Sequence, residues 1–245
     1  MLEQTGSDWK NQLFKRNNVI RISTGSVALD NLLGGGLPHS CVTDVFGAAG
    51  TGKTQFAFQN AMMTSQFLLE KKGVKVVFVD CAGSFRPERI VEMAETRSFD
   101  SRKILDSILS VYVRSVDEQI KASKRVELDP IFESLRLIIV DDVTTNFVSD
   151  FSGDEEIASR QQVLSSYARN LAYIANRRGI SVLLTNSIRS RGDLGEGETT
   201  GEALSSLVLY GLHFFRKDRE RIAELVQPDI SGGRASFEID ESGIN

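Results

Sequence analysis

The run GAAGTGKT at residues 47–54 constrains this chain more than any other feature, because it fits the pattern G-x-x-x-x-G-K-[S/T] without a mismatch. Its glycines, Gly47, Gly50 and Gly52, allow the backbone to wrap closely, so that successive N–H groups can face phosphate oxygens. A short β-rich run precedes the motif and a helical pattern follows it. The helix would add the positive end of its dipole. The sequence therefore predicts a phosphate-binding loop between a strand and a helix.

Further polar side chains complete such a site. Lys53 would bridge the β- and γ-phosphates of a nucleotide as a point charge, and the Thr54 hydroxyl would ligate Mg²⁺. The apolar run LRLIIVDD ends in Asp141 and Asp142. A carboxylate at the tip of a buried strand beside the loop holds Mg²⁺, usually through water. We therefore predict ATP and Mg²⁺ as cofactors, with Thr54 and Asp141 at the metal and Lys53 in a catalytic role.

From Val19 onward the chain alternates strand and helix patterns, which predicts an α/β fold with a mostly parallel, twisted sheet flanked by helices. The expected strands are nearly all apolar, as in sheets that are covered on both faces. Near the C-terminus three strand-like runs follow one another without a helix, which predicts an antiparallel extension. We expect one core at residues 19–245 after a polar arm at residues 1–18. The expected strands are residues 41–46, 74–80, 135–141, 180–186, 207–215, 219–226 and 235–239, and the expected helices are residues 54–71, one opened by Pro87, and residues 155–178.

The composition excludes several classes of protein. With 33 acidic and 29 basic residues the formal charge is −4, so no global positive field attracts nucleic acid, and any such binding must come from local patches. The first residues are polar, and no apolar run approaches the length that spans a membrane. Cys41 and Cys81 both lie in apolar runs, which indicates buried thiols in a reducing compartment. We expect a soluble, intracellular, cytoplasmic protein without a membrane partner.

Four segments make the chain resemble the RecA/RadA recombinase superfamily, in its archaeal and eukaryotic strand-exchange branch. They are RISTGSVALDNLLGGG at residues 21–36, the phosphate loop, FRPER at residues 85–89 and SDFSGDEEIASRQQ at residues 149–162. The first is shared with circadian-clock-type ATPases of the same fold, whereas FRPER and DFSG point to the recombinases. The resemblance implies a RecA-like P-loop ATPase core, ATP held between neighbouring protomers, and filaments that bind DNA through two mobile loops.

The resemblance also places Arg86 of FRPER near the nucleotide base, with a salt-bridged arginine at a helix start as the alternative. On the strand-like run SVLLTNS, the amide of Asn186 could sense the γ-phosphate, although Asn is also an ordinary turn-forming residue at such a place. The residues expected to bind ATP are Gly47, Ala48, Ala49, Gly50, Thr51, Gly52, Lys53, Thr54, Gln55, Arg86 and Asn186.

The chain departs from the family pattern at its N-terminus. In the family a helical DNA-binding domain precedes the core, but here Met1 falls just before it. The family's polymerisation hook is an aromatic residue followed three residues later by alanine, whereas Phe14 is followed by the polar run KRN. Core-only relatives of this kind resemble recombinase paralogues such as the RadB group, which assist a main recombinase. We therefore expect a RadA-type recombinase or another paralogue as partner and little tendency to form a homo-filament.

A second departure concerns hydrolysis. Where recombinases carry a glutamate before the glycine of a strand tip, this chain reads DCAG and has Ala82, whose side chain accepts neither a proton nor a hydrogen bond. In the family that glutamate orients the water that attacks the γ-phosphate, and such contributions are about 10²–10⁴ in rate. Asp142 is a candidate substitute with a catalytic role, and a turn or cap residue is the alternative. We expect tight ATP binding with slow hydrolysis.

The two segments that match the family's DNA loops are acidic. Residues 149–156 carry a net charge of −4, and residues 186–202 carry a net charge of −2. Such loops repel DNA unless Arg160, Arg189 and Arg191 lie forward of the acids, because duplex affinity depends on neutralising phosphates. These arginines are the candidate nucleic-acid-binding residues, and we expect weak binding of single-stranded DNA. Solvated acidic loops without a DNA role are the alternative.

These features favour an ATP-binding recombinase paralogue that assists homologous recombination and DNA repair by modulating a RadA-type recombinase on single-stranded DNA, with weak ATP hydrolysis. Two alternatives remain open. One is a non-hydrolysing, ATP-locked protein adaptor, which Ala82 and the acidic loops favour. The other is a clock-type signalling ATPase on the same fold, which FRPER and DFSG argue against.

Overall fold

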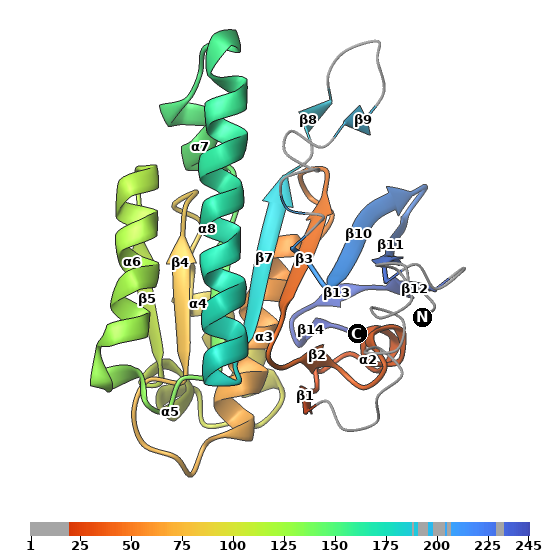
Figure 1. Ribbon diagram of the computed structural model, residues 1–245. Helices are drawn as coiled ribbons and strands as arrows, with labels where there is room; N and C mark the ends of the chain where they lie inside the picture. Colours follow the sequence, from red (N-terminus) through yellow and green to blue (C-terminus); the bar gives the residue numbers. More distant parts are fainter. Residues whose placement is uncertain (1–19, 188, 191–195, 198–203, 205–206, 229–232) are drawn as a thin grey trace, which may run out of the picture.

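The computed structural model describes residues 20–187, 189–190, 196–197, 204, 207–228 and 233–245 (Figure 1). The arm expected at residues 1–18 and the candidate DNA contact Arg191 lie outside the described residues. Within these ranges no helix combines the length and the apolar character that crossing a membrane requires.

An eight-stranded sheet of described residues forms the centre of the molecule, in the order β12-β11-β10-β3-β7-β6-β4-β5 (Figure 1). Neighbouring strands from β10 to β5 run parallel, whereas β10 with β11 and β11 with β12 run antiparallel. The predicted α/β fold, a mostly parallel sheet with a C-terminal antiparallel extension, is confirmed. The strands are β3 (Val42–Gly47), β4 (Val76–Asp80), β5 (Ile108–Tyr112), β6 (Leu137–Asp141), β7 (Ser181–Ser187), β10 (Tyr210–Lys217), β11 (Glu220–Gln227) and β12 (Arg234–Phe237).

The inner strands are buried on both faces, as their apolar composition predicts. Every residue of β4 and β6 is buried. Along β6 the side chains alternate, since Leu137 and Ile139 pack in one hydrophobic cluster, while Ile138 and Val140 pack in the other. The sheet therefore separates two cores and is covered by a helical layer on each face.

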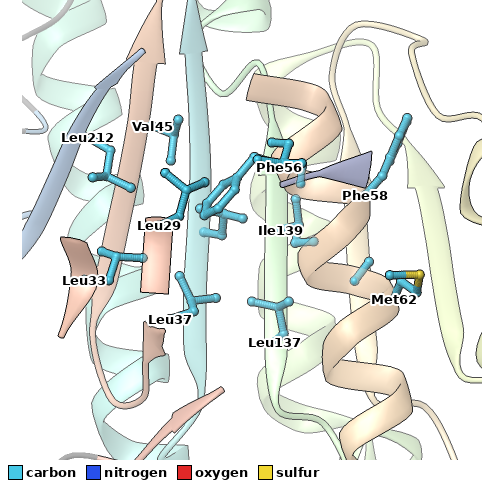
Figure 2. Packing of buried hydrophobic residues seen from close by; sticks show 14 of the residues in the cluster. Leu29, Leu33, Leu37, Val45, Phe56, Phe58, Met62, Leu137, Ile139 and Leu212 are labelled. Carbon is cyan, nitrogen blue, oxygen red and sulfur yellow. The ribbon is translucent and has the colours of Figure 1, made fainter. Parts of the chain in front are cut away.

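Helices cover both faces of this sheet (Figure 1). The clusters place α2, α3, α4 and α5 on one face and α6, α7 and α8 on the other. Phe56 and Met62 of α3 belong to the first cluster together with Leu137 and Ile139 of β6, and Figure 2 shows Phe56 beside Ile139. This packing holds α3, which follows the phosphate loop, rigidly against the sheet. The helices are α2 (Val27–Leu33), α3 (Lys53–Phe67), α4 (Pro87–Thr96), α5 (Ser101–Leu105), α6 (Val116–Leu128), α7 (Thr145–Asp150) and α8 (Ile157–Arg178).

The three helices expected from the sequence are present as α3, α4 and α8. Pro87 occupies the first turn of α4, where its missing N–H costs little. Helix α8 ends at Gly179, whose φ of 63° is the left-handed conformation that glycine adopts readily. The chain between α4 and β6 carried no prediction, and it forms α5, β5 and α6.

The C-terminal segment folds back onto α3. After β12 the chain forms the antiparallel hairpin of β13 (Ile239–Asp240) and β14 (Gly243–Ile244). The Gln59 amide of α3 donates hydrogen bonds to the carbonyls of Ile244, at 2.9 Å, and Thr24, at 2.8 Å. Segments from both ends of the described chain therefore meet on this helix. The remaining elements are β1 (Arg21–Ile22), β2 (Leu37–Pro38), β8 (Arg189–Ser190), β9 (Glu196–Gly197) and the 3₁₀ turns at Pro130–Phe132 and Asp154–Glu156.

Candidate nucleotide-binding site

The phosphate loop connects the end of β3 to the start of α3, and each of its glycines meets a steric demand. A Cβ atom at Gly47 would lie 2.0 Å from the carbonyl oxygen of Phe214, and one at Gly52 would lie 2.9 Å from Cδ1 of Ile239. Gly50 has open space around it, but its φ of 78° lies in the left-handed region, as does the φ of 112° at Gly52. The chain thus forms a close backbone cradle, with one open side at Gly50, of the kind that fits a phosphate group.

The ammonium of Lys53 is held inside this loop. Lys53 is buried, and its Nζ donates hydrogen bonds to the carbonyls of Gly47, at 2.8 Å, and Ala48, at 2.9 Å. Burial lowers the pKa of this amine, and the carboxylates of Asp142 and Asp141 oppose that shift. A phosphate oxygen would replace a neutral carbonyl with a charged partner, which makes a stronger hydrogen bond. The residues present therefore fit a nucleotide phosphate.

The carboxylate of Asp141, at the tip of β6, gathers three hydroxyl groups. Thr54 donates from the first turn of α3 at 3.2 Å, Ser84 donates at 2.6 Å from the loop after β4, and Thr185 donates at 2.6 Å from β7. Burial raises the pKa of this carboxyl, and the hydrogen bonds from Ser84, Thr185 and Thr54 oppose the shift. The structure thus brings Thr54 and Asp141 together, and their oxygens are of the type that Mg²⁺ prefers.

The oxygen donors on the protein are too few to hold a metal ion alone. Among the described residues no group of three or more His, Cys, Asp or Glu side chains is placed to bind a metal. Mg²⁺ retains water and shares phosphate oxygens in nucleotide sites of this type. Thr54 and Asp141 would hold it there, and the ion would neutralise charge on the phosphates.

Asp142 follows the metal-site carboxylate and has an unusual backbone. Its φ is 58°, in a region that non-glycine residues seldom occupy, and its N–H donates to the Thr185 hydroxyl at 2.8 Å. Its Oδ1 is buried and has no hydrogen-bond partner in the described chain. The backbone of Asp142 belongs to a turn, since its carbonyl accepts a hydrogen bond from the Thr145 N–H at 3.1 Å. The carboxylate nonetheless keeps an oxygen for another partner.

The loop after β4 is fixed by its own aspartate. The carboxylate of Asp80 accepts hydrogen bonds from the N–H groups of Ala82, Ser84 and Phe85 at 3.1, 3.0 and 3.0 Å. Ala82 is exposed beside the carboxyl ends of the strands, and its methyl group offers no acceptor. The loop is therefore rigid at the position where the family resemblance places a glutamate.

The amide of Asn186 is buried and hydrogen-bonded near the end of β7. Asn186 is 1% exposed, and its Oδ1 accepts a hydrogen bond from the hydroxyl of Thr144 at 3.0 Å. This contact ties the end of β7 to the residue that precedes α7. The role of Asn186 at the γ-phosphate remains a prediction. Its side-chain oxygen already accepts the hydrogen bond from Thr144.

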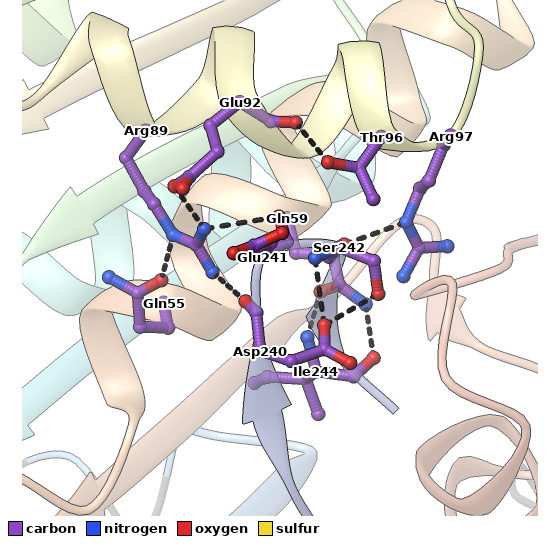
Figure 3. Close-up of polar contacts among 10 residues, drawn as sticks. All are labelled: Gln55, Gln59, Arg89, Glu92, Thr96, Arg97, Asp240, Glu241, Ser242 and Ile244. Atoms are coloured by element: carbon purple, nitrogen blue, oxygen red, sulfur yellow. Dashed lines mark hydrogen bonds and ion pairs between the residues drawn. The ribbon is translucent and has the colours of Figure 1, made fainter.

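Arg89 lies beside α3, the helix that follows the phosphate loop, and the role of Arg86 near the nucleotide base remains a prediction. Arg86 is exposed and donates to carbonyls of its own loop, those of Gly83 at 3.2 Å and Phe85 at 2.8 Å. The Nε of Arg89 donates to Oε1 of Gln55 at 2.8 Å (Figure 3). Sequence reasoning missed Arg89, although its spacing of four from the buried Met93 puts it on the inner side of α4.

Of the three candidate DNA-binding arginines, Arg160 is the one whose side chain the structure describes. Arg160 of α8 is half-buried, and its Nη1 donates to the carbonyl of Phe151 at 3.0 Å. In the acidic segment at residues 149–156, the Asp150 carboxylate accepts a hydrogen bond from the Val116 N–H at 2.8 Å, and it thereby links this segment to the start of α6. Arg189 starts β8, which pairs with β9, and its side chain is not described.

Fold and site together place the chain in the class of P-loop proteins with a RecA-like core. Proteins of this class have a glycine-rich loop between a parallel strand and a helix. A lysine lies inside the loop, and an acidic residue lies at the tip of a nearby strand. The Rad51 family model matches residues 15–245, and the chain belongs to that family.

Named relatives agree with this assignment. The chain is 35% identical over 252 residues to the meiotic recombination protein DMC1 homolog A of Oryza sativa subsp. indica, with 98% of this chain and 72% of the relative covered. It is 34% identical over 257 residues to the DNA repair and recombination protein RadA of Cenarchaeum symbiosum, covering 99% of this chain and 64% of that protein. RadA of Metallosphaera sedula is 34% identical over 242 residues, covering 94% and 74%.

Proposed function

We propose that this chain is an ATP- and Mg²⁺-binding recombinase paralogue that assists a RadA-type recombinase in homologous recombination and DNA repair. The observation that carries the nucleotide part is the convergence of the Lys53 ammonium, the Thr54 hydroxyl and the Asp141 carboxylate at the loop after β3. The family match and the names of the relatives support the recombination part. Bound ATP would supply a phosphoanhydride whose hydrolysis or retention sets the state of the protein.

Hydrolysis in this proposal is slow because Ala82 provides no acceptor for the attacking water. An Ala82→Glu variant should raise the steady-state ATPase rate by about 10²-fold or more, within the range of general-base contributions. The backbone there is already fixed by Asp80, so the added side chain has a defined origin. An unchanged rate would mean that the water is oriented elsewhere, and the unpartnered oxygen of Asp142 is the first group to examine.

The ATP-locked adaptor is a second candidate, and the exposed methyl group of Ala82 is the observation that favours it. The two candidates differ in the fate of bound ATP. A single-turnover experiment with excess protein, with and without single-stranded DNA, measures that fate directly. Conversion to ADP that DNA accelerates supports the recombinase paralogue, whereas ATP that persists for hours under both conditions supports the adaptor.

Among the described residues β5 has a strand partner on one side only, and this free edge supports a partner that binds as an extended segment. β5 is the last strand of the sheet, and beside it lies a cavity of about 350 Å³. Leu109 and Val111 of β5, Ala122 of α6 and Phe132 line this cavity. An unpaired edge can accept a further strand through main-chain hydrogen bonds, while a neighbouring pocket accepts one apolar side chain of that strand. We propose that a segment of the RadA-type recombinase occupies both.

Filling the cavity tests this docking mode. An Ala122→Trp variant should abolish capture of a purified RadA-type recombinase, because the indole occupies the space that the partner's side chain needs. Lys124→Trp is the matched control, since Lys124 is exposed on the same helix and does not line the cavity. Equal capture by wild type and both variants would contradict binding at the β5 edge.

Direct binding of single-stranded DNA in this proposal is weak. The two segments that match the family's DNA loops have a combined net charge of −6, the sum of −4 and −2. Few phosphates are then neutralised, so affinity should depend only shallowly on salt. Fluorescence anisotropy with a labelled oligonucleotide at several salt concentrations measures the slope, and tight binding with a steep slope would contradict the proposal.

A further inference from the structure

The turn of the C-terminal hairpin is held through its main chain by two arginines of the α4 segment (Figure 3). Arg89 donates to the carbonyls of Asp240 and Glu241, the latter at 3.1 Å. Arg97 donates from Nε to the carbonyl of Ser242 at 2.8 Å. Three consecutive carbonyls thus accept hydrogen bonds from guanidinium groups, which are stronger than bonds between neutral groups.

The opposite side of the hairpin is held by α3. The buried amide of Gln59 donates to the Ile244 carbonyl at 2.9 Å and accepts from the Ile244 N–H. Gly243 packs so closely that a Cβ atom there would lie 2.1 Å from Oε1 of Gln59. The hairpin therefore sits between α3 and α4 in a defined position.

The same contacts reach the phosphate loop. The guanidinium of Arg89 that binds the hairpin turn also binds Gln55, the residue after Thr54. On β13, the side chain of Ile239 packs against Gly52, the last glycine of the loop. Loop, first turn of α3 and hairpin thus form one connected set of packed groups.

We propose that the C-terminal hairpin is a nucleotide-responsive element, coupled to the phosphate loop through Arg89, Gln55 and Ile239. The proposal rests on the proposed nucleotide binding. A phosphate at Lys53 would compete with the carbonyls of Gly47 and Ala48 for its ammonium, and a shift of these two contacts would change the loop on which Ile239 packs. Because coupling between two sites is reciprocal, a hairpin held firmly in place raises nucleotide affinity, and bound nucleotide holds the hairpin more firmly.

Hydrogen exchange on the wild-type protein tests the coupling in one direction. Saturating ADP with Mg²⁺ should slow amide exchange at residues 239–245 by about tenfold, which lies within the usual range of coupling between sites. Residues of α6, on the opposite face of the sheet, serve as the internal control and should not change. Slower exchange at the phosphate loop without any change in the hairpin would overturn the proposal.

Two arginine variants test the reverse direction with a fluorescent ADP analogue and Mg²⁺. Arg97→Gln should weaken binding about tenfold, as should Arg89→Gln. Arg97 donates to the carbonyls of Ser242 and Gly25, and none of its described hydrogen bonds reaches the phosphate loop. Arg102→Gln, at an exposed site on α5, is the matched control.

The outcomes separate the coupling from the nucleotide assignment. Weak binding by Arg89→Gln with wild-type binding by Arg97→Gln would assign Arg89 a direct nucleotide contact and overturn the coupling. Failure of the wild type to bind the analogue at all would overturn both proposals. Circular dichroism of each variant checks that it is folded, and the wild-type exchange experiment remains decisive if one is not.

Discussion

Each glycine of the phosphate loop is required for its own physical reason. Gly47 has a carbonyl oxygen where a side chain would begin, whereas Gly50 has only a left-handed φ. Gly47 and Gly52, the latter beside Ile239, both combine a close neighbour with a positive φ, of 156° and 112°. The glycines of the motif are therefore needed because β10 and the C-terminal hairpin pack closely against the loop, and also because they leave room for a ligand.

The first prediction compares two alanine substitutions. Gly50→Ala should cost about 1–2 kcal/mol of stability, the usual penalty of left-handed backbone for a residue with Cβ. Gly47→Ala should cost about 1–3 kcal/mol more than Gly50→Ala, because Gly47 also has a positive φ, of 156°, and its Cβ would lie 2.0 Å from the carbonyl oxygen of Phe214. Urea unfolding measures both. A Gly47→Ala protein at least as stable as Gly50→Ala would contradict the packing described.

The thiols of Cys41 and Cys81 are buried and should be unreactive in the folded protein. Burial raises the pKa of Cys41 to about 12 and also raises the pKa of Cys81. At pH 8 only about 10⁻⁴ of the Cys41 side chain is then thiolate, the reactive form. The thiols of the native protein should therefore react very slowly with a thiol reagent. In urea, both thiols should react, so that two equivalents of reagent are consumed per chain. Rapid reaction of the native protein would contradict this burial.

At the residue scale, the sequence motif predicted the loop and the approach of Thr54 to Asp141, but not the rest of the site. Ser84 and Thr185 also bind Asp141, Ser84 from the loop after β4 and Thr185 from β7. Those strands flank β6 only because of the strand order, which residue patterns do not reveal. Arg89 was missed because its partners, Gln55 and the C-terminal hairpin, are distant in sequence.

Elements with continuous apolar runs were predictable, and half-buried ones were not. β4 and β6 are buried on both faces, so their composition alone identifies them. β5 lies at the edge of the sheet with alternating exposure, and α6 has a mostly polar surface. A local signal for α6 was present nonetheless, since Ser115 and Glu118 have the spacing of a capping box.

The third prediction tests that cap. The Ser115 hydroxyl accepts a hydrogen bond from the Glu118 N–H at 3.2 Å, at the start of α6. Ser115→Ala should destabilise the protein by about 1 kcal/mol, the usual value of such a cap. Ser115→Asp keeps an acceptor and should remain close to the wild type. Thermal unfolding compares the three proteins, and equal midpoints would show that the cap contributes nothing.

The strand order of the central sheet assembles the site. The loop follows β3 and Asp141 ends β6, with only β7 between them, so parts of the chain about 90 residues apart meet at one edge of the sheet. Helix α3 then lies across this region with β6 and the C-terminal hairpin against it. Nucleotide, metal ligands and hairpin are thereby proposed to act as one unit.

The most direct test is a calorimetric titration of a non-hydrolysable ATP analogue with Mg²⁺ into the wild type and Lys53→Ala. The wild type should bind, and the variant should bind about 10- to 100-fold more weakly, because a charge-assisted hydrogen bond contributes about 1.5–3 kcal/mol. Equal affinities, or no heat from the wild type at millimolar analogue, would contradict the assignment of residues 47–54 as a nucleotide site.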